Sequence, residues 1–312
     1  MSGHYKMLVE IQIDEVESEA AAISVLYSIL NGEQWPNRAT VLKIEHAEKE
    51  GGAAVIELKS TADIKPDQDL LISAIIASAK GDGKTTLAST FPDPLFFDFD
   101  GGMNSLMGTA YNYISNPNYE TMLEVMLSIQ RGGKPCASIG IKLTGEGVPL
   151  STDVEVPCRT VIFDSITKGH RRFLESAMAI GRRTQPAIQD WGLAATRLID
   201  IIEGLKPYVN VVICAHFEII KDANLERVMA QIWLPGQLVN LLPLGCDELW
   251  RIRTEVAAGN KRKFTLCTVS DGIYPGATRF AQRGMPPFVD ITDADGRDGR
   301  PKAYDLVRRC IK

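Results

Sequence analysis

The fold of this 312-residue chain is decided by the stretch Ser78-Ala79-Lys80-Gly81-Asp82-Gly83-Lys84-Thr85. It ends in Gly-Lys-Thr, follows an apolar run at residues 70–77 and precedes a helical pattern at residues 84–90. A strand, a glycine-containing loop and a helix in that order are typical of a phosphate-binding loop, because loop N–H groups and the helix N-terminus together surround a phosphate. The sequence therefore predicts such a loop, with one departure: Ser78 stands where the strict pattern has glycine.

Each residue type in this loop suits contact with a nucleoside triphosphate. Glycines allow the backbone to approach the phosphates closely, because they carry no Cβ atom. We expect Lys84 to bridge the β- and γ-phosphates and the Thr85 hydroxyl to ligate Mg²⁺. A loop that holds a phosphate without turning it over is the alternative. The expected nucleotide contacts are Ser78, Ala79, Lys80, Gly81, Asp82, Gly83, Lys84, Thr85 and Thr86.

Around the loop, short apolar runs alternate with helical segments. Strands are expected at residues 70–77, 94–99, 159–163, 209–215 and 248–253, and helices at 84–90, 119–130, 168–179, 190–205 and 238–242. This alternation is typical of an α/β fold in which crossover helices connect a mostly parallel sheet. Further strands or turns are expected at 263–269 and 278–280, and a hairpin or loop insertion at 135–157.

The pattern also suggests three parts of the chain. Residues 1–66 predict a small N-terminal α+β domain with the order β-α-β-β, from a strand at 7–13, a helix at 17–30 and a hairpin at 40–45 and 53–58. This block contains no chemical motif, and its acidic character favours a partner or self-assembly surface over a DNA surface. Residues 67–287 are expected to form the core, and residues 288–312 a C-terminal tail with a short helix.

Composition excludes several classes of protein. Hydrophobic residues make up 45% and charged residues 23% of the chain, which is ordinary for a globular protein and excludes a disordered chain. No run of about 18 apolar residues and no signal sequence is present, so we expect a cytoplasmic protein without a membrane partner. The formal net charge is −5, so nucleic-acid binding would require a local patch or an oligomeric groove. The six cysteines show no CxxC spacing, and zinc is not suggested.

Two further strands are expected to end in acids. Asp164 closes the apolar run that begins at Arg159, and we expect it to hold Mg²⁺ through water. An N-cap for the next helix is the simpler alternative. Asp98 and Asp100 follow another apolar run, and alternation would point both side chains the same way. Asp100 is expected to be the general base that orients the attacking water, whereas a tight Asp-Gly-Gly turn is the alternative.

A third strand is expected to end in His216. A polar group at that position could contact the γ-phosphate and report its loss to the segment that follows. An ordinary hydrogen-bonded histidine is the alternative.

At this point the sequence resembles a known family, the phage-encoded RecA-like P-loop ATPases. These are phage nucleotide-binding proteins, and some of them are single-strand annealing recombinases. The resemblance extends from about residue 60 to residue 287. It is carried by Gly81-Asp-Gly-Lys-Thr-Thr-Leu-Ala-Ser-Thr-Phe-Pro, Leu95-Phe-Phe-Asp-Phe-Asp-Gly-Gly and Val161-Ile-Phe-Asp-Ser-Ile-Thr, with Asp190-Trp-Gly, Ala215-His-Phe, Leu234-Pro-Gly-Gln-Leu and Cys246-Asp-Glu-Leu-Trp-Arg-Ile.

The resemblance implies a RecA-like core, ATP and Mg²⁺ as ligands, single-stranded DNA as partner, and assembly into a ring or filament. It implies a role in phage recombination or replication, in the host bacterial cytoplasm, with a phage single-strand binding protein as a further candidate partner. The family's catalytic carboxylate is usually Glu, and Asp100 occupies that place here. Because Asp is one methylene shorter, slow turnover is expected.

The family also implies a basic residue that reaches the neighbouring subunit's site. A Lys often stands two residues before the Arg, but that position is Ala277 here, which leaves Arg279. The expected catalytic residues are therefore Lys84, Asp100, Asp164, His216 and Arg279.

Signals for DNA in the residues themselves are weak. Basic clusters occur at 171–172, 182–184 and 261–263, and each fits a solvated face as well. The segment 217–233 combines Lys221, Arg227 and Trp233, residue types that suit single strands through phosphate charge and base stacking. A small-molecule P-loop kinase and a nucleotide-binding assembly protein with little or no hydrolysis stay as alternatives. The Arg-rich lid that is usual in such kinases is reduced here to Gly181-Arg-Arg-Thr.

Overall fold

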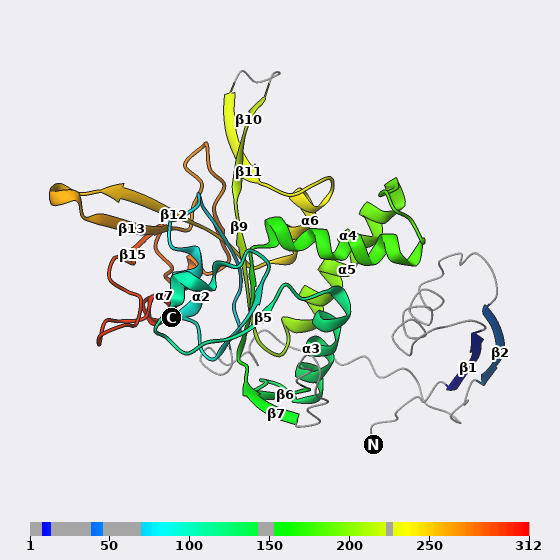
Figure 1. Cartoon of the computed structure of the whole chain (residues 1–312). Coiled ribbons are helices and arrows are strands. Elements are labelled where there is room, and N and C mark those ends of the chain that lie inside the picture. The colour runs from blue at the N-terminus through cyan, green and yellow to red at the C-terminus, as the bar shows by residue number, and fades with distance from the viewer. Residues whose placement is uncertain (1–7, 14–38, 46–69, 143–152, 223–226, 312) are drawn as a thin grey trace. The chain divides into compact units, whose positions relative to one another are not determined.

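A computed structural model describes residues 8–13, 39–45, 70–142, 153–222 and 227–311 (Figure 1). The chain divides into two compact units, Met1–Lys65 and Pro66–Lys312. In the first unit, β1 (Leu8–Ile13) pairs antiparallel with β2 (Ala39–Glu45). The expected helix at 17–30 and the strand at 53–58 lie outside the described residues.

The second unit is built on a nine-stranded sheet. Its order is β15-β13-β12-β3-β9-β8-β4-β5, and β14 pairs with β12 off this path. All strands from β12 to β5 are parallel to their neighbours. β13 and β14 each pair antiparallel with β12, and β15 pairs antiparallel with β13. The strands are β3 (Ser73–Ala77), β4 (Pro94–Asp98), β5 (Asn112–Ser115), β8 (Thr160–Asp164), β9 (Asn210–Ala215), β12 (Glu248–Val256), β13 (Arg262–Cys267), β14 (Ala277–Thr278) and β15 (Phe288–Asp290). This sheet confirms the α/β class with a mostly parallel centre.

Helices cover both faces of the sheet (Figure 1). They are α2 (Lys84–Ser89), α3 (Tyr119–Arg131), α4 (Ile166–Ile180), α5 (Ile188–Leu205), α6 (Leu238–Gly245) and α7 (Ala303–Cys310), with the 3₁₀ turns η2 (Gly102–Leu106), η3 (Ala258–Asn260) and η4 (Ala281–Arg283). Residues of α3, α4, α5 and α6 belong to one hydrophobic cluster, and residues of α2 and α7 belong to the other.

The central strand shows why the sheet is covered twice. Every residue of β3 is buried, as expected for a parallel strand with helices on both sides. Because side chains alternate along a strand, Ile75 and Ala77 enter one cluster, and Ala74 and Ile76 enter the other. This double burial fixes the end of β3, from which the phosphate loop starts.

Two antiparallel hairpins lie outside the sheet. The first pairs β6 (Ser138–Lys142) with β7 (Asp153–Pro157), within the insertion expected at 135–157. The second pairs β10 (Phe217–Asp222) with β11 (Arg227–Ile232) and projects away from the sheet in Figure 1. This second hairpin was not predicted from the sequence, where residues 217–233 stood out only for their basic and aromatic side chains.

Residues 288–311 are part of the packed core. β15 extends the sheet beside β13, and Ala303, Val307 and Ile311 are buried in the same cluster as Trp250. The short helix expected here is present as α7, but its apolar face packs onto the core instead of forming part of a free tail. No helix in the described part of the chain is long and apolar enough to cross a bilayer.

Candidate nucleotide-binding site

The phosphate loop joins the end of β3 to the start of α2. Gly83 is the N-cap of α2 with φ 87°, and Gly81 has the same φ, a left-handed conformation that disfavours any side chain. A Cβ atom on Gly81 would meet nothing within 4 Å, so backbone conformation and not space requires glycine there. The carboxylate of Asp82 accepts the Ala79 N–H at 3.0 Å and closes the loop on itself.

The departure at Ser78 is compatible with this geometry. Ser78 is buried and is not among the described residues with left-handed backbone, so a side chain there costs no conformational strain. Its hydroxyl donates to Ala79 O at 3.2 Å. Among the other expected contacts, Thr86 lies in the first turn of α2, and Lys80 is exposed in the loop.

Lys84 is buried beneath the loop. Its Nζ donates to the carbonyl oxygens of Ser78 at 3.1 Å and Ala79 at 2.9 Å. Burial lowers the pKa of Lys84, and nearby negative charges oppose that shift. A buried ammonium whose hydrogen-bond partners are neutral carbonyls would be stabilised by an added negative charge. The position therefore fits a phosphate.

Thr85 and Asp164 come together as the sequence predicted. The Thr85 hydroxyl donates to Asp164 Oδ2 at 2.6 Å, and Asp164 is the last residue of β8. Burial raises the pKa of Asp164, and the hydrogen bond from Thr85 opposes that rise. Within the described residues no group of three His, Cys, Asp or Glu could hold a metal. A hydroxyl and a carboxylate still fit Mg²⁺, because this ion is usually held by one or two protein oxygens together with substrate phosphates.

Asp98 and Asp100 have different surroundings, which corrects the expectation that alternation would align them. β4 ends at Asp98, so the strand period does not extend to Asp100. Asp98 Oδ1 accepts the N–H groups of Asp100 at 3.2 Å and Gly102 at 3.1 Å, and it thereby holds the turn. Asp100 faces the start of α4, where Ser165 Oγ donates to its Oδ2 at 2.9 Å.

His216 lies beside Lys84 at the same edge of the sheet. β9, which precedes His216, is inserted between β3 and β8 in the sheet, so its end emerges beside the phosphate loop. His216 Nδ1 lies 3.4 Å from Lys84 Nζ. Burial, together with the Lys84 ammonium, lowers the pKa of His216, and the imidazole is therefore neutral at pH 7.

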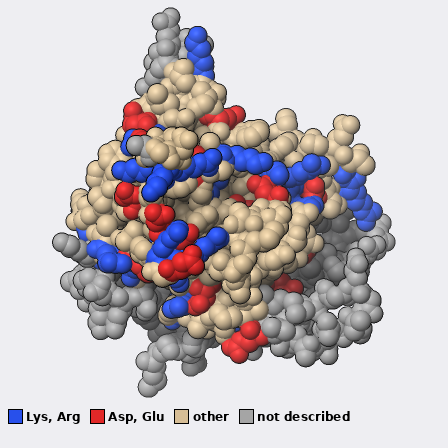
Figure 2. All heavy atoms as spheres, turned by 60° about the vertical axis from the view of Figure 1, so that its left-hand side comes forward, with Lys and Arg blue, Asp and Glu red and all other residues tan. Residues whose placement is uncertain are grey.

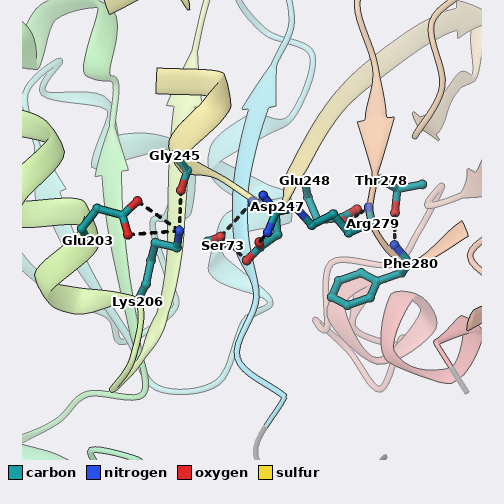
Figure 3. Close-up of polar contacts among 9 residues, drawn as sticks. All are labelled: Ser73, Glu203, Lys206, Gly245, Asp247, Glu248, Thr278, Arg279 and Phe280. Carbon is teal, nitrogen blue, oxygen red and sulfur yellow. Dashed lines mark hydrogen bonds and ion pairs between the residues drawn. The ribbon is translucent and has the colours of Figure 1, made fainter. Parts of the chain in front are cut away.

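Arg279 does not join this group. It follows β14, whose Thr278 pairs with Glu248 at the start of β12, and Glu248 in turn pairs with Ala74 at the start of β3. Figure 3 places Arg279 beside Asp247 and Ser73, with the β3 arrow pointing away from them. Arg279 therefore lies at the amino edge of the sheet, opposite the phosphate loop of its own chain, and its guanidinium pairs with Asp247 at 2.5 Å.

Lys168 and the cavity beside it were not predicted from the sequence. Lys168 Nζ lies 3.0 Å from Asp100 Oδ1. A cavity of about 630 Å³ adjoins this pair and is also lined by His216 and Trp233. A signal for Lys168 was present, since it stands within one helical turn of the acid that ends β8. No sequence signal placed Trp233, which reaches the site because β11 pairs with β10 and returns to His216.

Comparison with known proteins gives a family and three weak structural likenesses. A family model described as an AAA domain matches residues 72–280, more than half of the chain. No curated protein matches the sequence significantly.

Three similar solved structures illustrate the range. The flagellar accessory protein FlaH from Methanocaldococcus jannaschii is 12% identical, with 70% of this chain and 84% of that chain covered and a TM-score of 0.33. A KaiC-like protein from Pyrococcus horikoshii OT3 is 11% identical, with 63% and 78% covered and a TM-score of 0.30. A type III secretion system ATPase of pathogenic bacteria is 11% identical, with 71% and 65% covered and a TM-score of 0.34. Likenesses this low carry no functional conclusion.

Proposed function

Because this chain belongs to the AAA domain family and carries a nucleotide-binding P-loop domain of the ATPase type, we propose that it hydrolyses ATP and acts on single-stranded DNA. The observation that carries the ATPase proposal is the convergence at one edge of the sheet. Four neighbouring strands each contribute one side chain, either from their last residue or from the segment that follows. These side chains are Lys84, Asp100, Asp164 and His216, and they meet around the phosphate loop.

Each residue has a role that its surroundings support. The loop N–H groups and the Lys84 ammonium bind the β- and γ-phosphates, and Thr85 and Asp164 supply the oxygens that hold Mg²⁺. Mg²⁺ neutralises charge on those phosphates when it is bound. Asp100 orients the attacking water and accepts its proton. The neutral His216 contacts the γ-phosphate and passes its loss to the β10–β11 hairpin, which begins at the next residue.

Single-stranded DNA is proposed from the surface near this hairpin. Ile219 and Trp233 expose 56% of their area each, and Lys221 is exposed on the same hairpin. An exposed tryptophan and an exposed lysine at one hairpin suit single strands, because a base can stack on the ring and a phosphate attracts the cation. Figure 2, which brings the β12–β13 side forward, shows Lys and Arg gathered in a band. The strands β12 and β13 form a hairpin of their own, and Lys261, Arg262 and Lys263 are exposed near its tip.

We extend the proposal to a homo-oligomer, ring or filament, in phage recombination or replication in the host cytoplasm. Arg279 has a side chain 66% exposed at the edge opposite its own loop, where it could enter a neighbour's site. Such an arginine stabilises the charge of the transition state and is worth about 10³–10⁵-fold in rate.

Mixing two inactive variants tests the oligomer. Arg279→Ala keeps an intact loop and Lys84→Ala keeps an intact Arg279, so random mixing restores about one interface in four (½ × ½) if sites fire independently. A return of roughly a quarter of full activity would support action across the interface. An Arg279→Ala protein that is active alone would remove this role.

One assay tests the proposed function as a whole: ATP hydrolysis with and without single-stranded DNA, and with and without its complement. We expect single-stranded DNA to increase hydrolysis, and annealing of the complement to accompany it. A small-molecule kinase would need a metabolite and would ignore DNA. An assembly protein would bind ATP and hydrolyse nothing, with or without DNA.

A further inference from the structure

The cavity beside Asp100 has the lining of an anion site that borders the catalytic carboxylate. Its volume is about 630 Å³. Two lysines, two histidines and one aromatic side chain line it together with two carboxylates. Its lining includes Lys80, Asp100, Lys168, His216, Glu218 and Trp233. Of the carboxylates, Glu218 accepts a hydrogen bond from Gln231 Nε2 at 2.6 Å, and Asp100 pairs with Lys168.

The contacts of Asp100 bear directly on its proposed role as base. Lys168 Nζ lies 3.0 Å from Oδ1, and Ser165 Oγ donates to Oδ2 at 2.9 Å. A general base must offer an oxygen to the attacking water at about 2.6–3.2 Å. Ser165 therefore occupies Oδ2, whereas the buried Oδ1 accepts no hydrogen bond from the described residues and faces the Lys168 ammonium in an ion pair. Lys168 thus stands beside the oxygen that would otherwise be free to accept a water.

The two contacts differ in how easily they can be broken. Ser165 is fully buried at the start of α4, whereas the Lys168 side chain is 66% exposed. Exposed ion pairs contribute little and are screened by salt. Lys168 can therefore leave Asp100 when another anion competes for its ammonium.

We propose that this cavity binds a phosphodiester group of single-stranded DNA, and that Lys168 moves from Asp100 to that phosphate and so releases the base for catalysis. The inference rests on the proposed ATPase function and specifies its regulation. Lys80 adds a second cation, and Trp233 offers a ring on which the adjoining base stacks. Lys168 is thus a positioning residue that couples occupancy of the cavity to hydrolysis.

The γ-phosphate of ATP shares the chemistry of the DNA phosphate, so the experiment must separate the two sources. Steady-state hydrolysis by the full chain is measured with and without oligo-dT, for wild type, Lys168→Met and Lys168→Arg. Arg171→Ala is the matched control, because Arg171 lies on the same helix, is 79% exposed, pairs with Glu175 and does not line the cavity.

We expect Lys168→Met to increase the unstimulated kcat about two- to fivefold, the range that loss of an exposed ion pair allows. The oligo-dT-stimulated kcat and the KM for ATP should change less than about twofold, so the stimulation ratio falls. Lys168→Arg should restore the wild-type ratio, and Arg171→Ala should not change it. Added salt should raise the unstimulated rate of wild type relative to that of Lys168→Met, because only wild type has a contact to screen.

The other outcomes overturn the proposal in different ways. An unstimulated rate that falls or stays constant in Lys168→Met shows that the ion pair does not restrain Asp100. If the unstimulated rate rises in Lys168→Met but oligo-dT does not stimulate wild type, DNA is excluded as the source of the phosphate that binds in the cavity. If Asp100→Asn slows wild-type hydrolysis but Lys168→Met changes nothing, only this inference fails. If neither wild type nor Lys168→Met hydrolyses ATP, the proposed function fails with it.

Discussion

The two edges of the parallel sheet each carry a cluster of polar side chains, and the clusters differ in whether the charged groups have partners of opposite charge within the chain. At the amino edge, Arg279 pairs with Asp247, and Asp247 Oδ2 also accepts the Ser73 hydroxyl at 2.6 Å (Figure 3). Buried Glu248 accepts one hydrogen bond from Trp250 Nε1 at 2.7 Å and one from the Arg279 N–H at 2.8 Å. The charges and hydrogen bonds of this cluster are matched within the chain.

At the carboxyl edge, Lys168 pairs with Asp100, but the buried charges of Lys84 and Asp164 lie close without pairing directly. Lys84 is held by carbonyl oxygens, and Asp164 is held by a hydroxyl. Burial lowers the pKa of Lys84 and raises the pKa of Asp164, so both charged forms are disfavoured there. A ligand that brings phosphate charge and a cation would relieve both penalties.

Burial also raises the pKa of Glu248 at the amino edge, but that carboxylate accepts two hydrogen bonds and its neighbour Asp247 pairs directly with Arg279. The lack of a direct pair between Lys84 and Asp164, and not burial alone, therefore separates the two clusters.

The largest effect is expected when one lysine at each edge of the sheet is replaced by alanine and the two variants are compared. Lys84→Ala should abolish hydrolysis and weaken ATP binding in a folded protein, because it removes the buried cation under the phosphates. Lys206→Ala is the matched control: Lys206 pairs with Glu203 and donates to Gly245 O at 2.6 Å at the amino edge. Its hydrolysis should stay within about twofold of wild type, since this lysine lies at the edge of the sheet opposite the phosphate loop. Steady-state ATPase rates and circular dichroism check both, and wild-type turnover in Lys84→Ala would exclude the phosphate-loop assignment.

A smaller loss is expected from the carboxylate that orients water. Asp100→Asn should bind ATP nearly normally and hydrolyse it at least about tenfold more slowly, since a positioned base is worth about 10²–10⁴-fold. Binding of a fluorescent ATP analogue and single-turnover rates separate the two effects. Binding lost together with hydrolysis would instead indicate a turn with only a structural role. Asp100→Glu is the control, and faster turnover there would show that the shorter side chain limits the rate.

The variant Asp164→Asn should be more stable than wild type at pH 7. Its Mg²⁺-dependent ATP hydrolysis should fall at least about tenfold. Burial raises the folded-state pKa of Asp164, so the folded protein binds that proton more tightly than the unfolded chain does. The carboxylate therefore costs stability above the raised pKa, and the cost disappears as the pH falls to the ordinary value for aspartate. Urea denaturation from pH 7 to acid should show the advantage of Asn shrinking along that path. An Asn variant less stable than wild type at pH 7 would contradict this reasoning.

The smallest effect on folding stability is expected at the amino edge, apart from the loss of hydrolysis proposed above for Arg279→Ala. Arg279→Ala should lower the free energy of unfolding by less than about 1 kcal/mol, because its ion pair with Asp247 is largely exposed on the arginine side. Denaturation in urea measures this change, with Arg279→Lys as the control that keeps the charge. A loss of several kcal/mol would show that Arg279 is structural, and that its variants cannot report on a neighbour's site.

Most of the parallel sheet could be predicted because buried strands are continuous apolar runs that stop at a polar residue. That rule placed Asp164 and His216 correctly at strand ends. It failed for Asp100, since β4 already ends at Asp98 and the next residues form a turn.

Other features depend on contacts between distant segments. The position of Arg279 is set by β14, a two-residue strand whose antiparallel register with β12 no local pattern reveals. The packing of α7 did leave a signal, because Ala303, Val307 and Ile311 recur at helical spacing. The contact between Lys168 and Asp100 needs the relative position of α4 and the β4 turn, which spacing does not give.

The order of the sheet also bears on how this protein is made. In the part of the chain that the structure describes, the hydrogen-bonded neighbours of β3, which leads into the phosphate loop, are β9 and β12, and these begin at Asn210 and Glu248. A ribosome therefore finishes the loop long before either neighbour is synthesised, whereas β4, β5 and β8 can pair earlier. A chain arrested before Asn210 would hold the complete Gly-Lys-Thr motif on a strand without partners. ATP could then assist folding only near the end of synthesis, once β9 has taken its place between β3 and β8.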